Sequence, residues 1–161
     1  MRLLIATGVI FAGVLMAACG DDEKDSGATA TPGGTTTAAG GGTEVDVTLQ
    51  EFSVIPDTDS VSAGEITFKV ENAGPDDVHE LVILKTELDA DALPTVDDGS
   101  ADEEGAGIEV IDEIEDIPVG ETQDLTVDLE AGSYVLICNI FDETENEAHY
   151  TEGMRTAFTV E

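Results

Sequence analysis

Short alternations of apolar and polar residues, separated by turn residues, fill the chain from Glu44 to its end. In three segments apolar residues recur at every second position, which is the period of a strand with one buried face. These segments are Val45 to Leu49, Ile66 to Val70 and Leu125 to Leu129. Residues 81–84 and 134–138 are apolar at successive positions, as in strands covered on both faces. A last strand is predicted over Thr156 to Val160.

Turn signals separate these segments at short intervals, and most of the intervals hold no long amphipathic helix. The turns fall at Ala63-Gly64, Ala73-Gly74-Pro75, Val119-Gly120 and Ala131-Gly132. After Gln50-Glu51 the apolar positions change parity to Phe52 and Val54, which predicts a bulge or bend within the first strand. The pattern is typical of an all-β protein, an antiparallel β-sandwich.

The stretch from Lys85 to Asp116 does not follow this pattern. Asp89 to Leu93 predicts a helical turn, and Val96 to Gly107, which is acidic and contains glycine, predicts a mobile loop. Isoleucines then recur at every third position, which fits helical spacing, although the last of them could equally enter the next strand. They are Ile108, Ile111, Ile114 and Ile117. We therefore expect a long acidic insertion after the strand that begins at His79 and leave its secondary structure open.

The first residues have the features of an export signal. Arg2 precedes an apolar run from Leu3 to Ala18 that is short for a membrane span, and small residues lead into Cys19. The string Leu-Met-Ala-Ala-Cys resembles the bacterial lipoprotein signal, which implies removal of residues 1–18 and acylation of Cys19. A plain secretory signal with an incidental cysteine is the alternative.

Residues 19–43 are rich in Gly, Thr and Ala and show no hydrophobic period, so they predict a flexible tether. A tether of this length has a mean reach of about 25 to 30 Å. We expect a single folded domain over residues 44–161, held outside the cytoplasm by a lipid anchor on the outer face of the cell membrane or on the periplasmic side.

The charge of the chain is extreme, because 37 Asp and Glu face only 5 Lys and Arg, for a formal net charge of −32. Nucleic acid and anionic lipid surfaces are thereby excluded as partners. The acidity either attracts basic partners or keeps the surface hydrated in high salt, and charge alone does not separate these explanations.

Residues able to bind a soft metal are scarce and have a distinctive spacing. Beyond Met1, Met16 and Cys19, the histidines, cysteine and methionine of the chain are His79, Cys138, His149 and Met154. Ten residues separate Cys138 from His149, and four separate His149 from Met154. Two imidazoles, a thiolate and a thioether suit copper, because Cu(I) favours sulfur and Cu(II) favours nitrogen.

Each of these residues alone has an ordinary explanation: a strand-edge or solvated histidine, a buried thiol, a methionine that fills the core. Their conjunction favours a metal site, since an unpaired thiol in an exported protein is prone to oxidation unless it is protected.

Several segments resemble the cupredoxin family, to which plastocyanin and azurin belong: AGEITFKVENAG, HELVIL, EAGSYVLICNI, HYTEGM and FTV. The resemblance implies a Greek-key β-sandwich with one type 1 (blue) copper ion. It makes His79, Cys138 and His149 the equatorial ligands and Met154 the weak axial one. The interval NIFDETENEA after Cys138 is longer than in plastocyanin and azurin, and is similar to that of the type 1 centre of copper nitrite reductases.

The neighbours of these residues carry further expectations. Tyr134 and Leu136 share the inward face of a strand with Cys138, which predicts a dry shell around the sulfur. The resemblance implies that Asn139 fixes the ligand loop. It also implies an exposed ring edge of His149 as the electron port, beside an apolar surface formed by Ile140, Phe141 and Tyr150.

The function predicted from the sequence is that of an extracytoplasmic copper protein that carries single electrons and is not an enzyme. Two histidines do not supply the further copper ions of a multicopper oxidase. The alternatives are a copper-binding or copper-sequestering lipoprotein and, less favoured, a sandwich without metal that serves in docking. We expect a monomer that meets redox partners such as basic cytochromes or oxidase domains and touches the membrane only through its lipid.

Overall fold

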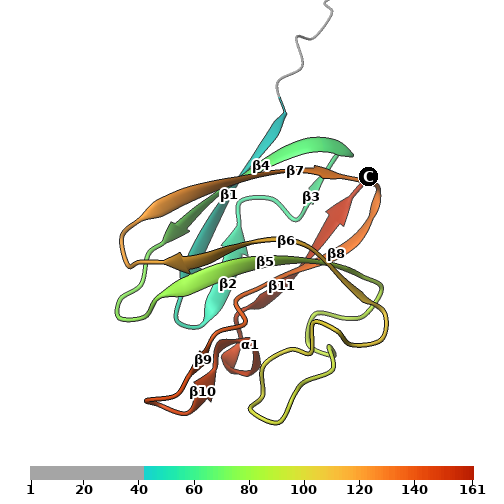
Figure 1. Cartoon of the computed structure of the whole chain (residues 1–161). Coiled ribbons are helices and arrows are strands. Elements are labelled where there is room, and N and C mark those ends of the chain that lie inside the picture. The colour runs from blue at the N-terminus through green and yellow to red at the C-terminus, as the bar shows by residue number, and fades with distance from the viewer. Residues whose placement is uncertain (1–41) are drawn as a thin grey trace, which may run out of the picture. The chain divides into compact units, whose positions relative to one another are not determined.

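The computed structural model describes residues 42–161 (Figure 1). The predicted signal, Cys19 and nearly all of the predicted tether therefore lie outside the described residues. No helix in the described part of the chain has both the length and the apolar character needed to cross a membrane.

The described residues form strands almost throughout. In chain order the elements are β1 (Thr43–Gln50), β2 (Ser53–Pro56), β3 (Ser60–Val61), β4 (Gly64–Asn72), β5 (His79–Thr86), β6 (Ile108–Ile117), β7 (Thr122–Leu129), β8 (Gly132–Ile137), β9 (Phe141–Asp142), β10 (Glu147–Ala148), α1 (His149–Glu152) and β11 (Arg155–Val160).

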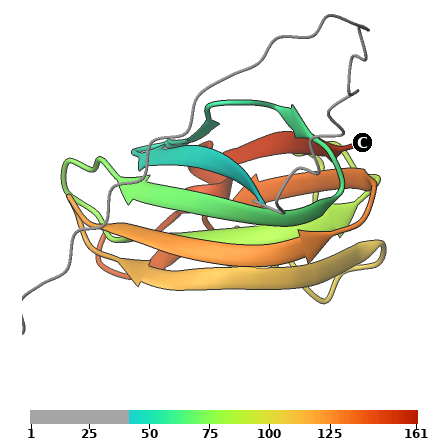
Figure 2. The ribbon, with the colours of Figure 1, turned by 90° about the horizontal axis from the view of Figure 1, so that it is seen from above.

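Two sheets pack face to face (Figures 1 and 2). One has the order β2-β1-β4-β7 and the other β3-β11-β8-β5-β6, while β9 and β10 form a separate hairpin. The predicted all-β sandwich is thus confirmed. The strand directions are mixed, because β1 runs parallel to β4 and β3 parallel to β11, whereas the other neighbours are antiparallel.

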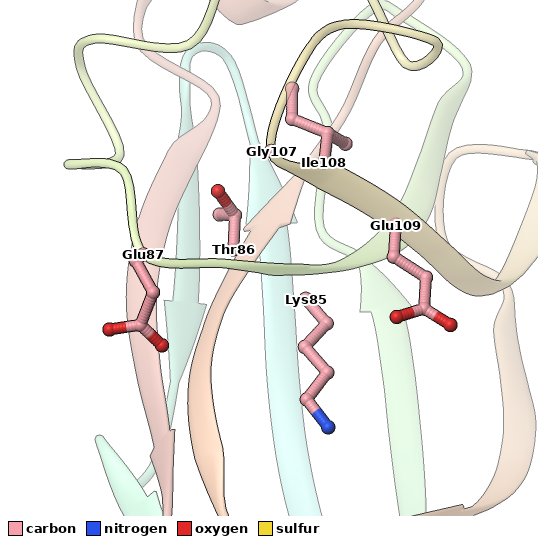
Figure 3. Close-up of a pocket in the computed structure, with 6 residues that line it drawn as sticks. All are labelled: Lys85, Thr86, Glu87, Gly107, Ile108 and Glu109. Carbon is pink, nitrogen blue, oxygen red and sulfur yellow. The ribbon is translucent and has the colours of Figure 1, made fainter.

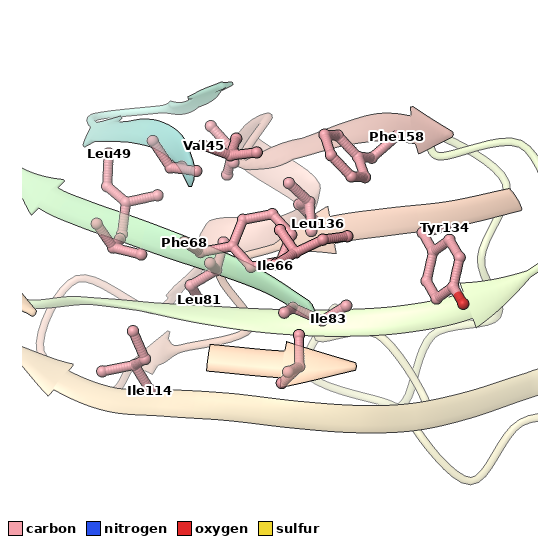
Figure 4. Close-up of a cluster of buried hydrophobic side chains, with 14 of the residues drawn as sticks. Val45, Leu49, Ile66, Phe68, Leu81, Ile83, Ile114, Tyr134, Leu136 and Phe158 are labelled. Carbon is pink, nitrogen blue, oxygen red and sulfur yellow. The ribbon is translucent and has the colours of Figure 1, made fainter. Parts of the chain in front are cut away.

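The core lies between the inner faces of the two sheets (Figure 4). In β4 the apolar residues Ile66, Phe68 and Val70 are buried, whereas Lys69 is exposed and Thr67 is half-buried, as a strand with one buried face requires. The ring of Phe68 meets that of Phe158 from β11 edge to face, with centroids 5.6 Å apart. This packing ties the two sheets together.

The parity change after Gln50 has a different cause from the predicted bulge. The chain reverses at Glu51 and Phe52, and β2 then pairs antiparallel with β1, with Leu49 opposite Val54. Val54 faces the core because it lies on a neighbouring strand, so the expectation of one bulged strand is wrong.

Residues Ile108–Ile117 form strand β6, which resolves the segment that the sequence left open. Its register with β5 shifts twice, between the partners of His79 and Leu81 and between those of Ile83 and Leu84. Each shift adds one residue to β6. Across such a bulge, neighbouring residues that face the core are three positions apart along the strand instead of two. The inward spacing of Ile111, Ile114 and Ile117 is therefore a product of β-bulges, whereas Ile108 packs against the apolar cluster on the other face of the sheet.

The β5–β6 loop, residues 87–107, covers the outer face of the five-stranded sheet. Within the predicted helical turn, Asp89 to Ala92 form a single turn, in which the N–H of Ala92 donates to the carbonyl of Asp89. Leu93 and Ala101 are buried in a second apolar cluster with residues of β5, β8 and α1. This packing fixes a loop that composition alone predicted to be mobile.

Candidate metal centre

The four predicted ligands converge at one end of the sandwich. Two of them belong to the antiparallel neighbours β5 and β8. His79 begins β5 and Cys138 directly follows β8, so the pairing of these strands brings the two residues together. His149 is the first residue of α1, and Met154 lies between α1 and β11. The four side chains are at most 1 % exposed.

The donor atoms of three of these residues face one another. The Nδ1 atoms of His79 and His149 are 3.3 Å apart. The Sγ atom of Cys138 lies 3.4 Å from Nδ1 of His149 and 3.9 Å from Nδ1 of His79. Among the described residues, these three form a group of side chains able to hold one metal ion.

These separations can be compared with those that a shared metal ion requires. Bonds of about 2.0 Å to nitrogen and about 2.3 Å to sulfur, at tetrahedral to trigonal angles, place two nitrogens about 3.3 to 3.5 Å apart and a sulfur and a nitrogen about 3.5 to 3.7 Å apart. The observed distances of 3.3, 3.4 and 3.9 Å fall close to these values. The cluster is thus preformed for a small metal ion with two nitrogen ligands and one sulfur ligand.

Backbone hydrogen bonds hold Met154 beside the other three residues. Its N–H donates to the carbonyl of His149 at 2.9 Å, and its carbonyl accepts from the N–H of Cys138 at 3.1 Å. Gly153 makes this tight turn possible, since its φ of +134° favours glycine and a Cβ there would lie 2.9 Å from the carbonyl oxygen of Phe52.

Burial favours the uncharged forms of Cys138 and His79 when no metal is bound. It raises the pKa of the Cys138 thiol to about 12, although backbone N–H groups of Ile140 and Glu80 act in the opposite direction. Burial also lowers the pKa of His79, with a further contribution from the neighbouring His149. A metal that binds here would replace the thiol proton and meet a neutral imidazole at His79.

The inward face predicted around Cys138 is confirmed, because Tyr134 and Leu136 are buried in the same core cluster as Cys138. Asn139, the first residue of the segment between Cys138 and His149, is bonded to the β5–β6 loop. Its side chain bonds Ala101 and Glu103. A hydrogen bond from this side chain to the rest of the segment is absent from the described structure.

The exposed edge predicted for His149 is also absent from the described structure. The ring is 1 % exposed, and Phe52, from the turn between β1 and β2, packs against it edge to face at 5.5 Å. Tyr150 is buried as well, and its hydroxyl accepts from the N–H of Leu93 and donates to the carbonyl of Ala90. Of the predicted apolar surface, Ile140 and Phe141 remain partly exposed.

A surface pocket lies at the opposite end of β5 from His79 (Figure 3). It is lined by Lys85, Thr86, Glu87, Gly107, Ile108 and Glu109. These residues include no thiol or imidazole, so the pocket has no part in the metal site.

Comparison with solved structures places this geometry among known folds, whereas no protein-family model and no curated protein matches the chain. Auracyanin from Roseiflexus castenholzii is similar with a TM-score of 0.51 at 22% sequence identity, over 76% of this chain and 99% of that one. Auracyanin A from Chloroflexus aurantiacus, described as a "blue" copper protein, has a TM-score of 0.51 at 20% identity, over 75% of this chain and 100% of that one. The chain has the cupredoxin fold. Reduced rusticyanin is similar to the same extent, with a TM-score of 0.51 at 18% identity, over 73% of this chain and 76% of that one.

The donor atoms at the site are consistent with the cupredoxin fold. His79, Cys138 and His149, with Met154 beside them, fit one type 1 copper ion. Two further residues at the site, Glu51 and Phe52, could not be inferred from the sequence, because they belong to a turn that is distant from all four ligands along the chain. Their contacts with His79 and His149 depend on how the two sheets meet.

Proposed function

We propose that this chain is an extracytoplasmic type 1 copper protein that carries single electrons between redox partners. His79, Cys138 and His149 would hold the ion, and Met154 would be a weaker ligand beside them. The observation that carries the proposal is the buried convergence of two imidazole nitrogens and one thiol sulfur within 3.3 to 3.9 Å. When bound, copper supplies the one-electron exchange between Cu(II) and Cu(I).

The chain contributes a donor set that need not rearrange when the copper changes its oxidation state. His79 and Cys138 sit on paired strands, and backbone hydrogen bonds link Cys138 to Met154 and Met154 to His149. The apolar core excludes water from the sulfur. A ligand set that moves little when the electron arrives permits rapid transfer. Since the chain has only two histidines and this site uses both, we propose a carrier rather than an enzyme.

A copper-binding or copper-sequestering module is the second candidate, and the burial of the donors argues against it. Transfer of copper between proteins by ligand exchange requires an incoming ligand to reach the metal. Met154 is fully buried and His149 is 1 % exposed, so neither side chain is presented at the surface.

Repeated redox cycling in the presence of a Cu(I) chelator separates the two functions. The copper-loaded protein is reduced with ascorbate and reoxidised with ferricyanide, beside a chelator that reports Cu(I) by its colour. An electron carrier should regain its full visible absorption after each cycle, with no copper in the chelator. Transfer of copper to the chelator within the first reduction would instead favour the copper-handling function.

We further propose that Cys19 carries a lipid that holds the domain at the outer face of the membrane, and that the protein acts there as a monomer. The excess of acidic residues supports basic redox proteins, such as cytochromes or oxidase domains, as partners. Electron transfer to a cationic acceptor should then slow steeply as salt rises, since charges are screened beyond about 8 to 10 Å near physiological ionic strength. A neutral acceptor is the control. Equal salt dependence with both acceptors would exclude steering by charge.

A further inference from the structure

The two ring nitrogens of His79 face different surroundings. Nδ1 points at the donor cluster, 3.3 Å from Nδ1 of His149. Nε2 is fully buried and has no hydrogen-bond partner. The charged atom beside it is Oε1 of Glu51, at 3.5 Å, and Glu51 is itself only 13 % exposed. A largely buried carboxylate therefore lies behind the ring, on the side away from the metal site.

Glu51 is held in this place by the β4–β5 loop. Its Oε1 accepts from the backbone N–H of Asp77 at 2.7 Å and from that of Asp76 at 3.1 Å. Buried Asn72 fixes the loop in turn, donating to the carbonyls of Asp77 and Ile117 and accepting from the N–H of Gly74. The other oxygen, Oε2, is buried without a partner. The carboxylate is thus positioned by the fold, while its second oxygen is left free.

We propose that Glu51 is a positioning residue for the copper site, which keeps the His79 proton on Nε2 and favours Cu(II) over Cu(I) by its charge. The part that concerns copper rests on the proposed function. The part that concerns the ring proton does not, because it can be observed without metal.

The proton follows from the chemistry of imidazole. A neutral ring carries one proton, and a carboxylate beside one nitrogen favours the tautomer that places the proton there. With Nε2 protonated, the lone pair of Nδ1 is available to a metal. The charge acts on the oxidation state because a negative group near a dry site stabilises the more positive ion.

Glu51→Gln tests the effect of the charge with little change in shape, because its amide oxygen can still accept from Asp76 and Asp77. That oxygen also stays beside Nε2, so the effect on the proton is tested with Glu51→Leu, which leaves no acceptor there. Asp76→Asn is the matched control, since it removes an equal charge from an exposed side chain of the same loop. Thermal unfolding of every variant shows whether the fold is intact, and Glu51→Asp, which keeps the charge on a shorter side chain, serves as a further variant.

The first measurement is nitrogen-15 NMR of the ring nitrogens in metal-free protein. In the wild type, in Asp76→Asn and in Glu51→Gln, which keeps an oxygen beside Nε2, His79 should be protonated at Nε2 alone. Glu51→Leu should show a substantial population protonated at Nδ1. The same Nε2 tautomer in a folded Glu51→Leu would overturn the role of Glu51 in positioning the proton, whatever the copper experiments show.

The second measurement is the reduction potential of the copper-loaded protein. Glu51→Gln should lose at least tenfold in its preference for Cu(II) over Cu(I). For a one-electron couple this loss is a rise of about 59 mV in the reduction potential. Glu51→Asp and Asp76→Asn should shift less. An unchanged potential in Glu51→Gln with an intact visible band would overturn the role of the charge. A wild type without such a band would instead refute the proposed copper function and leave the tautomer result standing.

Discussion

Replacing Asn139 tests how the β5–β6 loop is joined to the strand that delivers Cys138. The side-chain oxygen of Asn139 accepts from the N–H of Ala101 at 2.6 Å. Its amide nitrogen donates to the carbonyl of Ala101 at 3.1 Å and to Oε1 of Glu103 at 2.8 Å. Asn139→Ala removes all three hydrogen bonds and leaves the backbone groups of Ala101, which is 4% exposed, without partners.

The cost follows from these contacts. A hydrogen bond contributes about 0.5 to 1.5 kcal/mol, and a buried group left unpaired costs more. Asn139→Ala should therefore lower the free energy of unfolding of the metal-free protein by about 2 to 4 kcal/mol. Urea unfolding followed by circular dichroism measures this loss, with a lower midpoint and an unchanged slope. A loss below about 0.5 kcal/mol would show that the loop is held by its apolar contacts alone.

Asn139→Asp refines the test because it changes the charge and keeps the size. One carboxylate oxygen can still accept from Ala101, but the other replaces a donor and faces the carboxylate of Glu103. Like charges at this distance repel, and protonation relieves the repulsion. The deficit relative to the wild type should therefore grow as the pH rises from 4 to 7. A deficit that is independent of pH would contradict the contact with Glu103.

Three further perturbations address the axial ligand, a buried carboxyl group and the anchor. Met154→Leu should keep its copper and raise the reduction potential measured by voltammetry, because only a long, weak bond is lost; a variant that releases the metal would contradict the axial role. Burial raises the pKa of Glu80 from 4.5 to about 7, so the folded protein binds this proton more tightly than the unfolded protein does. The free energy of unfolding should therefore fall, by up to about 3 kcal/mol, as the pH rises from 4.5 to about 7. In Glu80→Gln, metal-free, this dependence should be smaller than in the wild type, and parallel stability curves would rule out the raised pKa. Cys19→Ser should move the protein from the membrane fraction to the soluble fraction, and equal retention without lipid in the mass spectrum would refute acylation.

The features that the sequence predicted correctly depend on local patterns or on rare residues. The alternation of Ile66, Phe68 and Val70 identifies a strand without knowledge of its partner, because burial of one face imposes a period of two. His79 and Cys138 are identifiable because the chain has so few thiols and imidazoles, and an exported protein has a chemical reason to protect a thiol.

The features that the sequence did not predict depend on contacts between distant segments. The spacing of Ile108 to Ile117 imitates a helix, and only the pairing of β6 with β5 reveals the bulges that place Ile111, Ile114 and Ile117 on one face. The parallel pairing of β1 with β4 leaves no local trace, because alternation shows that a segment is a strand but not which way its neighbour runs. Burial of His149 depends on Phe52, from a turn at the other end of the domain sequence.

Titration of the purified, metal-free protein with Cu(II), followed by visible absorption, decides whether His79, Cys138 and His149 form a type 1 copper site. An intense band from thiolate-to-copper charge transfer should grow linearly to one equivalent of Cu(II) and then stop. The band should be absent from Cys138→Ser. One equivalent of bound copper without an intense visible band, or a band that survives in Cys138→Ser, would contradict a type 1 site at His79, Cys138 and His149.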